Sequence, residues 1–277
     1  MMGGGVWIGI KKLCGRLALW EALVTGSCML HLNIVDTIRA AAQEELSISV
    51  LDLVYLLFRG EPLLIGEGMQ VIPFQWLSLC GCLLFVTCSY SCGDISDSGY
   101  RTLVYSGTRG KWWVSKTVFV HIITAILFCM VVGIAAATVW ITGERRFPLL
   151  AEFGDAGLLE PLARASLGTQ IVWLLLLPCM AFCVMASVQN ALAVLFGPTA
   201  AFFAAMAAFL ASVNTISPFL FPAVTMALRA VTLYEAGVPP EMLLCMMFVC
   251  DIAVNGTGYL VFRKKDCMEA QYLEVEQ

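Results

Sequence analysis

The sequence predicts an all-α polytopic membrane protein with six transmembrane helices, and three observations lead to this class. Hydrophobic residues make up 60% of the 277-residue chain, charged residues only 13%, and the mean hydropathy is +0.86. A soluble domain carries about 25% charged residues. Residues 68–93 and 117–143 contain no charge, and each run exceeds the ~20 residues that cross a bilayer core. Basic residues gather in short segments between or beside the apolar runs.

The predicted spans follow one another with short connections, so residues 1–277 form a single transmembrane domain. The first span comes after the basic N-terminal segment and contains Glu21. No charged residue occurs between Arg164 and Arg229, and Gly197-Pro198 divides this stretch, because Gly ends helices and Pro begins them. The predicted spans cover residues 17–35, 70–89, 117–140, 170–196, 199–216 and 242–262.

The basic residues predict that both termini lie in the cytoplasm (N-in, C-in). Three basic residues precede the first span, four lie between the second and third spans, and three follow the last. Short loops rich in Lys and Arg stay on the cytoplasmic side of a membrane. The predicted protein therefore crosses its membrane several times, with its first and last spans flanked by cytoplasmic segments.

Two segments on the opposite side are expected to be partly helical. Residues 36–67 have a helix-compatible pattern and would either lie along the outer membrane surface or cap the spans. Residues 217–240 combine four prolines with an apolar middle. They predict an outer helical hairpin between spans five and six, either dipping into the membrane or lying at its interface. Non-helical backbone is tolerated at membrane depth only where protein or a water-filled cavity covers it.

The connector between spans two and three, residues 91–116, is the most informative cytoplasmic segment. Asp94 and Asp97 are favourable N-cap residues, and Ser106-Gly107 provides a C-terminal stop. The pattern predicts a short helix parallel to the membrane, then a turn at residues 109–111, with Trp112 starting the third span. The alternative is an ordinary amphipathic segment that rests on lipid.

Polar residues inside the predicted spans are candidates for a transport pathway or a subunit interface. Asp251 and Asn255 lie one turn apart on the same face of the last span. Gln189 and Asn190 lie near the inner end of span four, and His121 near the inner end of span three. Ionisable groups in a membrane are costly and point to function. Their alternative role is hydrogen bonding between helices.

The residues do not indicate binding of ATP, a metal ion or nucleic acid. The chain has no G-x-x-x-x-G-K-[ST] phosphate loop, so it has no ATP site of its own. Its cysteines lack metal-ligand spacing, so no metal site is expected, and no basic tract indicates nucleic-acid binding. The predicted protein is not an enzyme and holds no cofactor.

The arrangement resembles the permeases of type-2 ATP-binding-cassette exporters, in particular the six-span subunits of lantibiotic and bacitracin self-immunity systems. The resemblance lies in residues 105–116, YSGTRGKWWVSK, placed between spans two and three, and in the hairpin before the last span. In that family the connector carries a coupling helix that docks on an ATPase subunit. Glu21 and the long segment 36–67 fit the family less closely.

The resemblance implies a subunit that exports an amphipathic or peptide-like molecule. ATP and Mg would be bound by a separate nucleotide-binding subunit, and a second permease subunit, identical or related, would complete the pathway in the lipid bilayer. The expected coupling residues are Asp97, Tyr100, Arg101, Leu103, Val104, Tyr105, Arg109 and Lys111, and the expected membrane-interface anchors are Trp112, Trp113 and Lys116. The alternatives are a non-catalytic sensor or scaffold subunit and a secondary transporter.

Overall fold

A computed structural model gives the fold of most of the chain. It describes residues 3–42, 47–61, 71–88, 108–152, 156–214 and 221–264. These residues form helices joined by short segments, and none of them is in a β-strand. The all-α class predicted from the composition is therefore confirmed for the described part of the chain.

Four helical stretches among the described residues are long and apolar enough to cross a membrane. They correspond to the first, third, fourth and sixth predicted spans, and each is longer than the prediction. The four are Gly15–Ile38 within α1 (Gly3–Ala42), α6 (Arg109–Ile141), the continuous run Leu167–Phe196, and α12 (Pro240–Lys264). The structure is compatible with a multi-pass membrane protein.

The second and fifth predicted spans are represented by shorter helices. They are α3 (Phe74–Cys88) and α10 (Pro198–Val213), of 15 and 16 residues. The rise per residue gives them lengths of about 22 and 24 Å, less than the ~30 Å of a bilayer core. Six spans, with α3 and α10 as the second and fifth, therefore stay a prediction.

The run Leu167–Phe196 contains a wide turn that the sequence reading did not anticipate. It consists of α8 (Leu167–Ile171), the π-helical turn η2 (Val172–Leu176) and α9 (Leu177–Phe196). Pro178 lies in the first turn of α9, where it has no N–H and its ring crowds the carbonyl of the preceding turn. A π-helical turn accommodates both effects without ending the helix. Gly197, with φ +88°, then separates α9 from α10, as predicted.

The outer segment before α3 contains a helix that is buried in the protein. This helix, α2 (Val50–Phe58), has eight of its nine residues buried, including Asp52. Its first turn is capped completely: Val50 N–H and Leu51 N–H donate to the carbonyls of Arg146 and Phe147, and Asp52 N–H donates to Ser49 Oγ. α2 therefore packs among the longer helices, which agrees better with a segment that caps the spans than with one that lies along the membrane surface.

Two further helical pieces lie between α10 and α12, within the predicted hairpin 217–240. They are the 3₁₀ turn η3 (Phe221–Thr225) and α11 (Ala227–Glu235), and both are largely buried. A short helix, α7 (Ala156–Ala163), precedes α8. Leu228 N–H donates to Arg59 O at 3.1 Å, which joins α11 to the end of α2.

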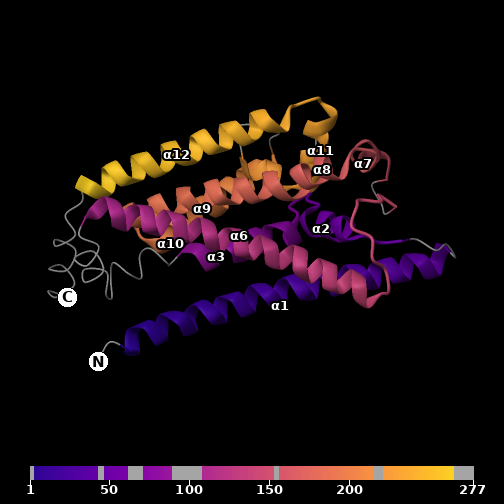
Figure 1. The fold of residues 1–277 in the computed structure, drawn as a ribbon, viewed down its shortest axis with the longest axis horizontal. Coiled ribbons are helices and arrows are strands. Elements are labelled where there is room, and N and C mark those ends of the chain that lie inside the picture. The colour runs from indigo at the N-terminus through magenta and orange to yellow at the C-terminus, as the bar shows by residue number, and fades with distance from the viewer. Residues whose placement is uncertain are drawn as a thin grey trace.

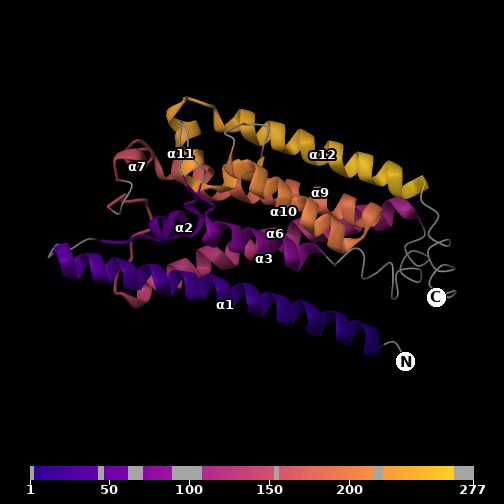
Figure 2. The ribbon, with the colours of Figure 1, turned by 180° about the vertical axis from the view of Figure 1, so that it is seen from behind.

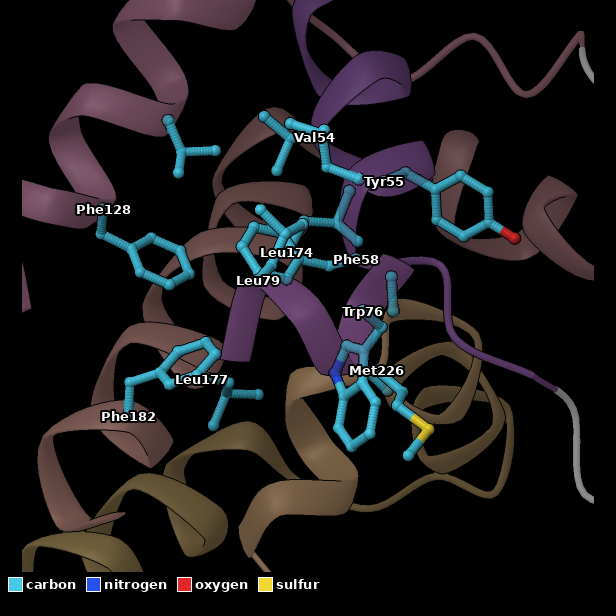
Figure 3. Packing of buried hydrophobic residues seen from close by; sticks show 14 of the residues in the cluster. Val54, Tyr55, Phe58, Trp76, Leu79, Phe128, Leu174, Leu177, Phe182 and Met226 are labelled. Carbon is cyan, nitrogen blue, oxygen red and sulfur yellow. The ribbon is translucent and has the colours of Figure 1, made fainter. Parts of the chain in front are cut away.

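The long helices run side by side, with α1 along one edge of the bundle and α12 along the opposite edge (Figures 1 and 2). The beginning of α6 and the end of α12 lie at one end of the bundle, and α2, α7, α8 and α11 gather toward the other (Figure 1). Phe58 at the end of α2 stacks on Phe128 of α6 and contacts Phe182 of α9 (Figure 3). The core is thus filled by α2 between the long helices.

The connector differs from the prediction where it meets α6. Residues 109–111 were expected to form a turn, and instead they are the first helical turn of α6. Thr108 is the N-cap residue, and its side-chain oxygen accepts a hydrogen bond from Lys111 N–H at 3.3 Å. A Thr cap outweighs the low helix propensity of Gly110 because it satisfies a backbone donor that would otherwise have no partner.

Candidate functional site

The coupling helix predicted in the connector lies outside the described residues. This applies to six of its proposed contact residues, and only the last part of the connector can be examined. The six are Asp97, Tyr100, Arg101, Leu103, Val104 and Tyr105. Arg109 and Lys111, the remaining two, lie in the first turn of α6.

The first turn of α6 is fastened to the last turn of α12. Arg109 Nη1 donates to the backbone carbonyl of Arg263 at 2.7 Å. Carbonyls in the last turn of a helix have no partner within that helix, and a cation there also interacts favourably with the helix dipole. Arg109 therefore joins two helices that are far apart in the sequence.

The paired tryptophans strengthen the same junction. Trp112 and Trp113 are 1% and 3% exposed, and both stack on Phe262 of α12, with ring centroids 4.8 Å and 5.7 Å apart. They were expected to anchor α6 at the membrane interface, with Lys116. The structure buries the indoles between helices, because α12 covers the face of α6 that carries them, and their position at the membrane interface stays a prediction. Lys116 is also buried, with Nζ 5.8 Å from the centre of the Trp112 ring.

Farther along these helices, a polar cluster connects α6, α9 and α12. His121 Nε2 lies 3.1 Å from Asp251 Oδ2, and Ser187 Oγ donates to Asp251 Oδ1 at 2.6 Å. His121 Nδ1 lies 2.7 Å from the carbonyl of Thr117, which fixes the orientation of the imidazole. Asp251 thus receives polar contacts from both neighbouring helices.

Asn255 extends the cluster by one helical turn. Its Nδ2 donates to Ser187 Oγ at 3.1 Å and to the carbonyl of Asp251 at 2.9 Å. Its Oδ1 accepts a hydrogen bond from Thr117 Oγ1 at 3.0 Å. Five side chains from three helices therefore form one network, and the predicted pair Asp251–Asn255 lies at its centre.

The geometry limits the chemistry that this cluster can perform. Ser187, His121 and Asp251 are the residue types of a hydrolase triad, but Ser187 donates to the carboxylate and not to the imidazole. In a triad the serine hydroxyl bonds to one imidazole nitrogen and the carboxylate to the other, whereas here Nε2 of His121 faces Asp251 and Nδ1 faces the carbonyl of Thr117. The cluster can hold a proton between His121 and Asp251, and it can fasten three helices together.

Gln189 and Asn190 lie apart from this cluster, although both are on α9. Gln189 Oε1 accepts a hydrogen bond from Thr87 of α3 at 3.1 Å. The amide nitrogens of both residues are buried and find no hydrogen-bond partner in the described part of the chain. The predicted pathway residues are therefore separated: Asp251 and Asn255 bond to α6, whereas Gln189 bonds to α3.

Sequence reasoning missed Ser187 and Thr117 as members of the cluster. Hydroxyl residues are common in apolar helices, where they bond to their own backbone, so neither residue stands out. The spacing of four residues in both Thr117–His121 and Asp251–Asn255 was the available signal, because it places each pair on one helix face. Among the described residues, no three His, Cys, Asp or Glu side chains gather in a group that could hold a metal ion.

Comparison of the chain with protein-family models, with curated proteins and with solved structures finds no match in any of the three.

Proposed function

We propose that the chain is the membrane-spanning permease subunit of an ATP-binding-cassette exporter, with six spans and both termini in the cytoplasm. It moves an amphipathic or peptide-like molecule outward, and it contributes no ATP site. A separate ATPase subunit binds ATP and Mg, and a second permease subunit, identical or related, completes the pathway. The proposed location is the plasma membrane of a bacterium.

One observation supports this proposal most directly: the cytoplasmic connector leads into a helix junction that can transmit force. Arg109 bonds to the end of α12, and Trp112 and Trp113 pack on Phe262. The polar contacts of His121 and Asn255 continue the attachment along the same two helices. A displacement of the connector therefore moves α6 and α12 together.

This attachment gives a route by which a movement of the ATP-hydrolysing partner is passed to the helix bundle. An α-helix with all its internal hydrogen bonds behaves as a stiff rod over its length. A load applied at Thr108 passes into α6 (33 residues) and, through the junction, into α12 (25 residues). Both helices also contact α9, so the load reaches the middle of the bundle.

Co-purification tests the proposed partner. We expect Tyr100→Asp combined with Leu103→Asp to abolish recovery of an ATPase subunit with the tagged full chain, because two carboxylates would desolvate poorly in a docking interface. The matched control, Tyr100→Phe with Leu103→Ile, keeps the apolar character and retains the partner. Equal recovery with the Asp variant would show that this segment is not the coupling helix.

A secondary transporter is the second candidate, and the pair His121–Asp251 favours it. An imidazole and a carboxylate 3.1 Å apart inside a helix bundle can take up and release a proton. In that case Asp251→Asn would abolish transport driven by a proton gradient in vesicles without ATP. Under the exporter proposal the same variant assembles and still exports with ATP, since Asn retains hydrogen bonds to Ser187 and His121.

A further inference from the structure

A cavity between α1, α2 and α3 is separate from the polar cluster. Its volume is about 380 Å³, and its lining includes His31, Arg59, Glu61 and Gln75. Cavities of roughly 300–1,000 Å³ are the usual size of small-molecule sites. Four of its lining residues belong to α1, the helix that runs along one edge of the bundle (Figure 2).

The lining of this cavity combines a buried apolar wall, which includes Val35, Leu57 and Trp76, with polar residues that are less deeply buried. His31, Arg59, Glu61 and Gln75 are partly buried, and His31 Nε2 lies 2.7 Å from Gln75 Nε2. Further apolar lining residues are exposed: Ile34 by 46%, Ile38 by 41% and Phe74 by 74%. Neighbouring exposed apolar side chains mark a surface for a membrane or a partner, and here they are suited to the acyl chains of a bilayer.

We propose that this cavity binds one membrane amphiphile with a zwitterionic head group. The head would meet Arg59 through its anionic group and Glu61 through its cationic group, and the amide of Gln75 would supply a neutral hydrogen bond. The tail would lie along Ile34 and Ile38 of α1. The positive Arg59 and the negative Glu61 line the same cavity, so together they complement a head group that carries one positive and one negative charge. A head group with only one charge would be repelled by the residue of the same sign.

The inner wall of the cavity also holds α11 in place. Gly60 packs against Met226, Arg59 O accepts a hydrogen bond from Leu228 N–H, and Trp76 Nε1 donates to Thr225 Oγ1 at 3.0 Å. A bound head group thus touches the residues that join α2 and α3 to η3 and α11. Binding therefore stabilises this junction, and the thermal unfolding temperature rises with ligand concentration.

Native mass spectrometry of the delipidated full chain in detergent tests the proposal. The probes are phosphatidylethanolamine (zwitterionic), phosphatidylglycerol (anionic) and diacylglycerol (uncharged), each added separately at the same concentrations. We expect one retained phosphatidylethanolamine and weaker binding of the other two. Glu61→Gln should weaken phosphatidylethanolamine binding about tenfold, as expected for the loss of one hydrogen bond to a charged group.

A steric variant separates a specific site from lipid that merely surrounds the protein. Ile34→Trp fills the rim and should remove the retained lipid, whereas Ile122→Trp, at an exposed position of α6, should leave binding unchanged. Equal retention of all three lipids, or unchanged binding by Ile34→Trp, would overturn the proposal.

The inference rests on the proposed membrane-spanning bundle and not on the ATPase. Recovery of the chain in the soluble fraction would contradict the bundle itself, whereas a membrane-extracted chain without retained lipid would contradict only the site.

Discussion

At the scale of single residues, Gly258 is a position where α12 lies tightly against Trp113 of α6 and Ala191 of α9. A Cβ atom at this position would lie 2.6 Å from Cζ2 of Trp113 and 3.1 Å from the Cβ of Ala191. Neither neighbour can move easily, because the indole is buried and stacked on Phe262. The absence of a side chain at Gly258 is therefore what allows the tryptophan to pack between α12 and α9.

We predict that Gly258→Ala destabilises the protein by about 1–3 kcal/mol, the usual cost of overpacking a buried contact. The measurement is the thermal unfolding temperature of the full chain in detergent. The matched control is Gly256→Ala on the same helix, where an added Cβ would meet nothing within 4 Å. The control should be neutral or slightly stabilising, since Ala favours helix over Gly. Equal effects of the two variants would contradict the packing described for Trp113.

The candidate site was only partly predictable from its residues. Asp251 and Asn255 could be placed on one helix face, because the period of a helix determines which residues of one segment lie together. The sequence does not contain the information that Ser187 of another helix would reach the same point, since this depends on how α9 packs against α12. The burial of Trp112 has the same origin, because Phe262, which covers it, lies more than a hundred residues away in the sequence.

At the scale of helical elements, Arg229 holds three segments together. This α11 residue is 1% exposed, and its guanidinium donates to the carbonyls of Ser212 and Val213 at the end of α10. Its Nε also donates to the carbonyl of Glu61 at 3.4 Å. The planar guanidinium can bond in several directions at once, which a lysine ammonium on a flexible chain cannot reproduce.

We therefore predict that Arg229→Lys lowers the stability by about 1–3 kcal/mol although the charge is kept, because buried carbonyls lose their donors. The control is Arg164→Lys on the exposed surface near α7, which should change stability by less than about 0.5 kcal/mol. Chemical denaturation monitored by tryptophan fluorescence measures both variants. A Lys variant as stable as the wild type would show that the carbonyls of α10 find other partners.

The long helices could be predicted from the sequence where a run of apolar residues alone sets their limits. The predicted limits of spans three and four lie within α6 and the run Leu167–Phe196, and Gly197-Pro198 separated α9 from α10. The position of α2 could not be predicted, because its burial depends on residues 146–151, which cap its first turn from a distant part of the chain. The first turn of α6 was also read wrongly, since the local signal of Gly110 was given more importance than the Thr108 cap.

At the scale of the whole molecule, the proposed orientation makes a prediction of its own. We expect alkaline phosphatase fused after Gly143, where α6 has ended, to be active, because this enzyme needs the oxidising outer side of the membrane. The same enzyme fused after Lys264 should be inactive, whereas green fluorescent protein at that position should fluoresce. The two fusions test opposite ends of the bundle. Reversed activities would contradict the N-in, C-in orientation and with it the cytoplasmic position of the connector.

The central claim is that ATP hydrolysed by a partner acts on this bundle through the connector. The most direct measurement is the rate of ATP hydrolysis by the full chain extracted from its own membrane in mild detergent, purified and placed in nanodiscs. The account predicts vanadate-sensitive hydrolysis that co-elutes with the chain and is lost from the preparation of the Tyr100→Asp, Leu103→Asp variant. A wild-type preparation of the intact chain that hydrolyses no ATP would contradict it.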